Sequence, residues 1–408
     1  MLELKPMIHK FRMKDNYYCL DVNSGIIHVI DELIDRVLDI YDGTNRDAVH
    51  AALDAKEDAV ELDEIMDELD ELIKAEQLFA PMSTEFKLVV GEKPIVKALC
   101  LNIAHDCNLA CKYCFASQGD YGGVKRELMS FDVAKRAVDF LIKMSGPRQH
   151  CEIDFFGGEP LMNFDVVKKT VEYARGIEKE HDKNFRFTIT TNGLLLTDDK
   201  IDFINREMSN VVLSLDGRKE VNDKLRVSPN GSGSYDVIVP KYQKLVAERS
   251  DKDYYVRGTF TKNNLDFTKD IIKMSELGFD QLSIEPVVSD TKLDYSIKKE
   301  DLPRVFEEYE TLAKEMIKRK KSGKCFNFFH FMIDLDQGPC AIKRLRGCSC
   351  GNEYIAVTPN GDVYPCHQFV GERQWKMGNV VENSFNEEIK TKFAKTNIYT
   401  KEKCKNCW

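Results

Sequence analysis

The chain has 408 residues, of which 43% are hydrophobic and 31% charged, with a net charge of -9 and an isoelectric point near 5.6. This composition supports a large core and excludes wholesale disorder, and the negative charge argues against a nucleic-acid partner. No apolar run approaches the roughly 18 residues that a membrane span needs, and "MLELKPMIHK" lacks the features of a signal peptide. We therefore expect a cytoplasmic protein of two or three domains that binds no membrane.

Residues 1–80 are predicted to form a small separate module. Two β-like runs flank the turn Asn23-Ser24-Gly25, and two stretches of apolar residues at helical spacing follow, near 33–41 and 62–73. Acidic residues on the opposite face of the second helix are expected to be solvated. Residues 81–96 are predicted to be a linker.

From residue 97 onward, short apolar strands alternate with amphipathic helices. The predicted strands are 97–103, 151–156, 185–191, 211–215, 254–260 and 281–286, and the predicted helices lie near 130–145, 163–180, 197–207, 234–248, 264–277 and 300–321. Six β/α units predict a parallel sheet over residues 97–321, either doubly wound or an open barrel. Functional side chains are then expected at the carboxyl ends of the strands. Residues 322–408 contain few apolar runs and many cysteines and turns, as is typical of a domain organised by metal.

Thirteen cysteines in a cytoplasmic chain indicate metal ligands or reactive thiols, because disulfides are rare in that compartment. They gather in three groups: Cys107, Cys111 and Cys114; Cys340, Cys348, Cys350 and Cys366; and Cys404 and Cys407. Three of the four scattered cysteines lie in apolar strand-like runs and are expected to be buried hydrophobes.

The first group has the spacing C-x3-C-x2-C, directly after the first predicted strand. Structural zinc sites have four protein ligands, and no second cysteine pair lies nearby in the sequence. A thioredoxin-like pair would leave Cys107 without a role. Iron–sulfur clusters accept thiolates at such short spacing. Spacing alone therefore leaves zinc and a cluster both open and favours the cluster slightly.

Together with Tyr113 before its last cysteine, this run resembles the motif of radical S-adenosylmethionine enzymes, and the resemblance extends over residues 97–290. "GGEP" (157–160), "TTNG" (190–193), "SLDG" (214–217) and Arg226 follow in the family's order. The resemblance implies a 4Fe–4S cluster on Cys107, Cys111 and Cys114, with one iron open to S-adenosylmethionine, and a deoxyadenosyl radical as the reactive product. The implied cofactor-binding residues are Tyr113, Gly157, Gly158, Glu159, Thr191, Asn192, Ser214, Asp216 and Arg226. The glycines are expected to let the backbone approach a ligand.

The cysteine-rich end resembles the SPASM extension, which holds two auxiliary 4Fe–4S clusters in enzymes that modify peptides. The resemblance implies Cys340, Cys348 and Cys366 as ligands of one cluster and Cys404 and Cys407 as ligands of the other. Cys350 is the alternative to Cys348. The family's pattern continues with further cysteines where this chain stops at Trp408, so we expect a missing tail. A zinc knuckle at Cys404 and Cys407 stays open.

The module 1–80 resembles the winged-helix-like element with which peptide maturases bind the leader of a precursor peptide. The alternative is an accessory or dimerisation domain. The implied fold class is α/β: a partial (β/α)6 TIM-like barrel with this N-terminal peptide-recognition domain and a C-terminal iron–sulfur (SPASM) domain.

The whole layout, especially "DVNSGIIHVID" and "GCSCGNEYIAVTPNGDVYPCHQFVG", resembles the maturases of six-cysteine (SCIFF) peptides. This resemblance implies an enzyme that forms cysteine-sulfur-to-carbon thioether links in a cysteine-rich precursor peptide, supplied with electrons by a flavodoxin or ferredoxin. Three alternatives remain. One is sulfatase maturation, against which His367 counts because such relatives carry aspartate there. Another is carbon–carbon or carbon–oxygen crosslinking, and the last is a zinc-stabilised peptide-binding scaffold. No catalytic acid or base can be named from the sequence.

Overall fold

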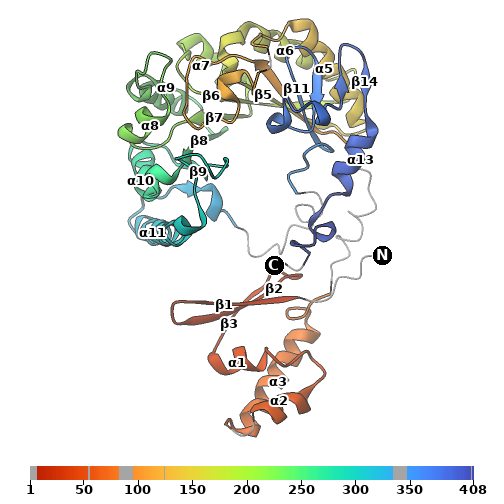
Figure 1. Cartoon of the computed structure of the whole chain (residues 1–408), viewed down its shortest axis with the longest axis vertical. Helices are drawn as coiled ribbons and strands as arrows, with labels where there is room; N and C mark the ends of the chain where they lie inside the picture. The colour runs from red at the N-terminus through yellow and green to blue at the C-terminus, as the bar shows by residue number, and fades with distance from the viewer. Residues whose placement is uncertain (1–6, 54–55, 82–94, 124, 334–346, 406) are drawn as a thin grey trace. The chain divides into compact units, whose positions relative to one another are not determined.

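The computed structural model describes residues 7–53, 56–81, 95–123, 125–333, 347–405 and 407–408. The chain divides into two compact units (Figure 1). One unit comprises residues 1–93, 333–348 and 395–408, and the other comprises residues 94–332 and 349–394. No helix in the described ranges combines the length and the apolar character needed to cross a membrane.

The N-terminal part of the first unit is a small three-stranded antiparallel sheet followed by helices. Its strands are β1 (Ile8–Met13), β2 (Asn16–Asp21) and β3 (Ile27–Ile30), in the order β1-β2-β3, and its helices are α1 (Glu32–Val37), α2 (Arg46–Leu53) and α3 (Ala59–Lys74). Cys19 of β2 is fully buried in one core with Val37, Val49 and Met66. The two predicted strands and two predicted helices are confirmed; β1 and α2 were not predicted.

The second unit is built around one sheet, which has eleven strands among the described residues. Their order is β10-β9-β8-β7-β6-β5-β4-β11-β12-β13-β14. Pairing is parallel from β10 to β11 and antiparallel from there to β14. The bounds are β4 (Ala98–Ala104), β5 (His150–Gly157), β6 (Asn184–Thr191), β7 (Asn210–Ser214), β8 (Asp253–Phe260), β9 (Gln281–Pro286), β10 (Asn327–Phe328), β11 (Tyr354–Val357), β12 (Asp362–Tyr364), β13 (Gly378–Asn379) and β14 (Ser384–Phe385).

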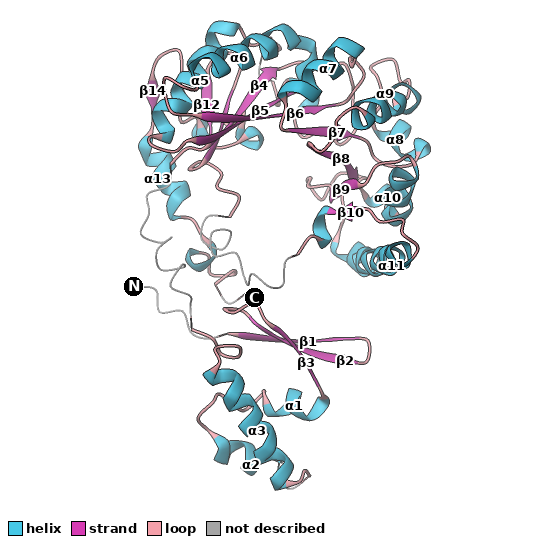
Figure 2. Ribbon diagram, turned by 180° about the vertical axis from the view of Figure 1, so that it is seen from behind, coloured by secondary structure: helices cyan, strands magenta, loops and turns pink. Residues whose placement is uncertain are grey.

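Helices lie along the outer side of the arc of strands β4 to β10 (Figure 2). The helices of this unit are α5 (Phe131–Ser145), α6 (Phe164–Ile177), α7 (Asp198–Glu207), α8 (Lys219–Leu225), α9 (Tyr235–Ala247), α10 (Phe267–Glu276), α11 (Leu302–Lys321) and α13 (Glu387–Lys395), which ends at the border with the first unit. Alternate strand residues such as Phe155, Phe187 and Val256 are fully buried in the core that the helices share with the sheet. Their neighbours along the strands therefore face the inner side. The predicted α/β partial barrel is confirmed, with all six predicted strands.

The predicted domain limits (1–80, 97–321 and 322–408) stay predictions, and the linker 81–96 lies mostly outside the described residues. Two observations bear on them. Strand β10 follows residue 321 and pairs with β9. Strand β11 pairs with β4, so residues 349–394 extend the barrel's own sheet.

Candidate functional site

The three cysteines of the first group lie in the loop after β4 and line one pocket of about 460 Å³. The pocket also contains eight of the nine predicted cofactor-binding residues, from the loops after four different strands: Tyr113, Gly157, Gly158, Glu159, Thr191, Asn192, Ser214 and Arg226. The ninth, Asp216, is fully buried directly behind this wall. The structure therefore brings the motifs together at the carboxyl ends of the strands, as predicted.

Two glycines join the loop after β5 to the cysteine loop. The amide of Gly158 donates to the carbonyl of Ala104 (2.7 Å), and the amide of Glu159 donates to the carbonyl of Asp106 (2.9 Å). A Cβ at Gly157 would lie 2.4 Å from the Ala104 oxygen, and one at Gly158 would lie 2.1 Å from the Asp106 oxygen. These glycines thus permit a close approach to the end of β4 and to the backbone of the cysteine loop, and their predicted place beside a ligand stays a prediction.

The carboxylate of Glu159 is fully buried and held by three donors. It accepts hydrogen bonds from the Thr191 hydroxyl (2.7 Å) and from the backbone amides of Leu161 (3.0 Å) and Asn192 (2.7 Å). Burial raises the pKa of Glu159 to about 7, although these donors oppose the shift. Glu159 therefore fixes the loop after β6, and its role in binding the cofactor stays a prediction.

The loop after β6 returns to the cysteines through Asn192. The side-chain amide nitrogen of Asn192 (Nδ2) lies 2.8 Å from the Asn108 side-chain oxygen and 3.7 Å from the sulfur of Cys107. The backbone amide of Leu109 also donates to that sulfur (3.4 Å), and the amide of Gln118 donates to the sulfur of Cys114 (3.3 Å). Donors of this kind stabilise a ligating thiolate.

A buried ion pair closes the pocket behind the cysteines. The guanidinium of Arg226 lies 3.0 Å from an oxygen of Asp216 and stands over the ring of Tyr113, 5.5 Å from its centroid. The Tyr113 hydroxyl donates to both oxygens of Asp216, at 2.7 and 2.9 Å. Backbone hydrogen bonds from Ala110 to Val227 and from Lys112 to Leu225 hold the cysteine loop against this segment. One carboxylate thus positions the aromatic residue and the cation together.

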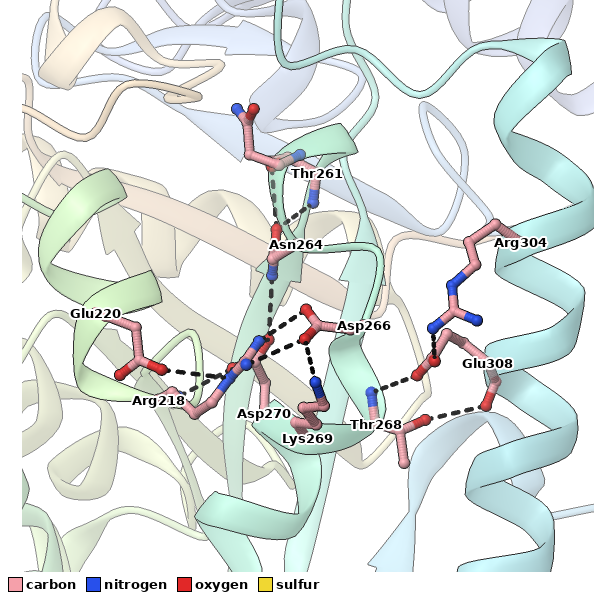
Figure 3. Close-up of polar contacts among 11 residues, drawn as sticks. Arg218, Glu220, Thr261, Asn264, Asp266, Thr268, Lys269, Asp270, Arg304 and Glu308 are labelled. Carbon is pink, nitrogen blue, oxygen red and sulfur yellow. Dashed lines mark hydrogen bonds and ion pairs between the residues drawn. The ribbon is translucent and has the colours of Figure 1, made fainter.

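The loop that carries Asp216 is fixed from outside by a polar network (Figure 3). Arg218 binds Asp270 (2.7 Å) and Asp266 (2.8 Å), and Asn264 joins Asp270 to Thr261. Gly217 has a φ of 99°, and a Cβ there would lie 2.2 Å from the Cβ of Asp270. Because Asp270 lies on α10, the network sets the position of Asp216 from the helix layer.

Burial governs the thiols themselves. It raises the pKa of Cys107 to about 12, with Glu159 and the neighbouring thiols adding to the shift, and it raises the pKa of Cys111 to about 11, which Arg226 opposes. Such thiols stay protonated unless a cation binds them, and metal binding is what deprotonates a ligating thiol. Three thiols on one pocket wall, with amide donors at two sulfurs, fit an iron–sulfur cluster.

Among the other cysteines, the structure brings Cys350 and Cys366 together. A hydrogen bond from Cys350 lowers the pKa of Cys366 to about 7 against the effect of burial. This contact supports Cys350, the alternative ligand. Cys348 is exposed, Cys404 is half-buried in the turn that leads to Cys407, and Cys340 lies outside the described residues. Within the described ranges, no three His, Cys, Asp or Glu side chains are grouped as a site for a single ion, so these assignments stay predictions.

The pocket has a further wall that the sequence did not reveal. Arg257 and Thr259 of β8, Glu285 of β9, and His367 line it together with Phe156. The ring of His367 lies 4.8 Å from that of Phe156. Burial, and to a smaller extent the charge of Arg257, lowers the pKa of His367 to about 4, so His367 is neutral at pH 7. The period-two alternation of β8 and β9 could have assigned Arg257 and Glu285 to one face, but not to this pocket.

Family models match two stretches of the chain. Residues 101–251 match the radical SAM superfamily, and residues 348–408 match the SPASM iron-sulfur cluster-binding domain. The chain is a radical SAM enzyme with a SPASM domain. Such an enzyme uses S-adenosylmethionine, a radical SAM 4Fe–4S cluster and auxiliary clusters in the SPASM domain. The expected fold class is confirmed as an α/β partial barrel with a small N-terminal sheet domain and a C-terminal SPASM domain, and the peptide-recognition role of the N-terminal domain stays a prediction.

The enzyme is related to anaerobic sulfatase-maturating enzymes. It is 26% identical over 326 residues to the cysteine-type anaerobic sulfatase-maturating enzyme of Clostridium novyi, covering 74% of this chain and 82% of that protein. The structure of anSMEcpe with bound AdoMet and Kp18Cys peptide shares the fold, with a TM-score of 0.61, 22% identity and coverage of 76% and 86%. Streptococcus suis SuiB bound to its precursor peptide SuiA matches over 98% of this chain and 92% of that chain, with a TM-score of 0.56 and 16% identity.

Proposed function

We propose that this radical SAM enzyme joins cysteine sulfur to carbon in a ribosomally made cysteine-rich precursor peptide. The observation that carries the proposal is a radical SAM site and a SPASM domain in one chain with a separate small-sheet domain suited to hold a peptide. The likeness in fold to SuiB, a protein solved with a precursor peptide, covers 98% of this chain and so includes its N-terminal domain, which supports the same assignment.

The N-terminal sheet is proposed to bind the precursor's leader. Strand β3 lies at the edge of the sheet, and its side chains Ile27 and Val29 are 41% and 72% exposed. An extended peptide that adds to such an edge gains main-chain hydrogen bonds and buries apolar side chains. The leader would then tether the rest of the precursor to the enzyme.

In the barrel, each pocket residue has a proposed role. Cys107, Cys111 and Cys114 would hold the radical SAM cluster, while Glu159, Asn192, Ser214 and Arg226 would orient S-adenosylmethionine beside it. When bound, these groups supply one-electron chemistry that removes a hydrogen atom from an unactivated carbon. The buried Asp216–Arg226 pair closes the wall behind the cysteines. Two auxiliary clusters would be held by Cys340, Cys348 or Cys350, and Cys366, and by Cys404 and Cys407, and a flavodoxin or ferredoxin would supply electrons.

The test uses a six-cysteine precursor with its leader, incubated anaerobically with reductant and S-adenosylmethionine. We expect the peptide to lose two hydrogens for each thioether, with deoxyadenosine formed. Fragmentation by mass spectrometry then places the link at a cysteine sulfur. A peptide of unchanged mass, under conditions in which deoxyadenosine forms, contradicts the proposal.

A second candidate function is maturation of a sulfatase, favoured by the relative from Clostridium novyi. His367, a neutral residue in the pocket wall directly after Cys366, stands where the resemblance expects an aspartate. Incubation with the Kp18Cys peptide separates the two, because turnover of that peptide and not of the precursor would favour the sulfatase function.

A further inference from the structure

Two charged side chains of opposite sign stand next to each other on the pocket wall formed by β8 and β9. Arg257 and Glu285 both line the pocket, and their neighbours Val256 and Ile284 are buried in the core. The guanidinium lies 3.8 Å from the carboxylate. This separation is longer than a hydrogen bond, so neither group satisfies the other.

The carboxylate of Glu285 is held in place by a serine hydroxyl and a histidine ring. The Ser283 hydroxyl donates to one carboxylate oxygen (2.9 Å), and Nε2 of His330 lies 2.9 Å from the other. Nδ1 of His330 lies 2.8 Å from the hydroxyl of Tyr309, on α11. These partners assign the Nε2–H form to the ring, which donates to Glu285 and accepts from Tyr309. The carboxylate is thereby oriented before any ligand binds.

The Glu285 carboxyl is ionised near neutral pH. The hydrogen bond from His330 holds the pKa of Glu285 below its ordinary range against burial, with Ser283 and Arg257 acting in the same direction. Glu285 is therefore an ionised acceptor. A carboxylate so weakly basic is better suited to accept hydrogen bonds than to remove protons.

Arg257 supplies the matching donors. Within the described part of the chain its guanidinium makes no hydrogen bond, and its side chain is 56% exposed. A guanidinium presents its N–H groups in a rigid fork that suits carbonyl and carboxylate oxygens. The rings of Phe115 and His367 lie beside this pair, with centroids 5.4 Å apart. The wall thus offers aromatic rings next to one cationic donor and one anionic acceptor.

We propose that Arg257 and Glu285 form a clamp for the main chain of the substrate peptide: Arg257 donates to a peptide carbonyl and Glu285 accepts from a peptide N–H. Because every residue except proline carries this carbonyl and N–H pair, the clamp orients the peptide without reading its side chains. His330 and Tyr309 are positioning residues that hold the carboxylate. The proposal rests on the proposed function and adds how the peptide is presented to the site.

The test compares product formation with cofactor consumption. In Arg257→Ala we expect deoxyadenosine to form from S-adenosylmethionine while thioether links per deoxyadenosine fall roughly 10- to 100-fold, as for loss of a hydrogen bond to a charged group. Arg257→Lys keeps the positive charge but not the forked N–H donors, so the loss of thioether links per deoxyadenosine should be intermediate. Glu285→Gln should raise KM more than it lowers kcat. His330→Gln should lower the link yield less than Glu285→Gln does.

A matched control is Arg186→Ala on β6, whose side chain is 54% exposed and lies 3.5 Å from Asp253. Arg186 lies outside the pocket, so this variant should match the wild type in both products. The melting temperatures of all variants are compared, so that a folding defect is not read as loss of the clamp.

Peptides with single backbone esters identify the acceptor partner. An ester removes one N–H, so wild-type enzyme should lose link yield at one ester position, and Glu285→Ala, which has no side-chain acceptor, should show no further loss there. Equal sensitivity of both enzymes at every position overturns the clamp, as does a wild-type link yield in Arg257→Ala. Dependence on one acidic side chain of the peptide instead would assign Arg257 to that side chain and also overturn it. If wild-type enzyme forms no link at all, the proposed function itself fails.

Discussion

The edge of the N-terminal sheet and the strand ends of the barrel are built in opposite ways. Strand β3 exposes apolar side chains, with Val29 72% accessible, on a sheet whose core is otherwise covered by helices. In the barrel the apolar faces are buried, and polar groups such as Asp216 and Glu159 are fully enclosed at the ends of strands. An exposed apolar edge is suited to bind a partner, and enclosed polar groups are suited to fix reacting groups in place. The comparison predicts that one set of substitutions abolishes leader binding and a different set abolishes deoxyadenosine formation.

The largest effect is expected from removing the thiols of the barrel. The triple variant Cys107→Ala, Cys111→Ala, Cys114→Ala should abolish deoxyadenosine formation, because no other thiols line that pocket among the described residues. Leader binding to the N-terminal domain should be unchanged, as measured by fluorescence anisotropy of a labelled leader. Cys325→Ser, at an exposed cysteine, is the control and should keep both. Cofactor cleavage in the triple variant would refute the assignment of these ligands.

The next effect concerns the buried pair behind the cysteines. Asp216→Asn leaves Arg226, whose side chain is only 11% exposed, with an uncompensated charge. Breaking a buried pair in this way costs about 3–5 kcal/mol, so the urea midpoint of the barrel should fall and S-adenosylmethionine should bind more weakly. Asp236→Asn breaks an exposed pair with Lys219 and should change the midpoint little. Similar midpoints for the two variants would mean that Asp216 does not support the site.

A smaller effect is expected at the sheet edge. Val29→Asp places a charge where the leader would bury an apolar side chain. Burial of such a side chain contributes about 1.5–3 kcal/mol, so the leader should bind roughly 10- to 100-fold more weakly, while deoxyadenosine formation without peptide stays unchanged. Val60→Asp introduces the same change at a residue of α3 that is 65% exposed and should keep leader affinity. Equal losses in both variants would place the leader elsewhere.

The barrel was predictable because its pattern is local. Runs such as 151–156 and 185–191 alternate buried and inward-facing residues and are bounded by turns, so all six strands were predicted within a few residues. The cysteine spacing and the motifs at the strand ends likewise predicted one shared site. Short elements were missed, among them α8 and β10, because two to seven residues carry too little periodicity.

What the sequence did not predict depends on contacts between distant segments. Arg257 and His330 are 73 positions apart, and only the fold brings both to Glu285. Spacing did not reveal that Gly157 and Gly158 pack against the backbone of Ala104 and Asp106, and their predicted place beside a ligand stays a prediction. Spacing favoured Cys348 as the ligand, and this assignment stays a prediction. Spacing did not reveal that Ser349, with a φ of 59°, begins a turn or that Cys350 contacts Cys366. Such turns are set by backbone conformation that spacing does not reveal.

The smallest predicted effect is a pH dependence confined to the N-terminal domain. Asp70 of α3 accepts hydrogen bonds from Tyr41 and Arg46, which lower its pKa and outweigh the opposing effect of burial. A carboxyl whose pKa is lower in the folded chain stabilises the fold above its ordinary pKa of about 3.9, and this stability is lost as the pH falls through the folded value. Because the side chain is 39% exposed, Asp70→Asn should cost less than about 1 kcal/mol at pH 7.

Hydrogen exchange of α3 in the full chain measures this cost. We expect faster exchange in Asp70→Asn than in wild type at pH 7 and equal protection once the pH is below the folded pKa of Asp70. Glu71→Gln, at a neighbouring residue with a 76% exposed side chain, should match wild type at both pH values. Exchange in the barrel strands should not respond to either variant, because Asp70 has no part in their core. A response in the barrel strands would show that the two units unfold together. The sheet edge and the pocket would then still differ in how their surfaces are built, but the stability of one unit would depend on the other.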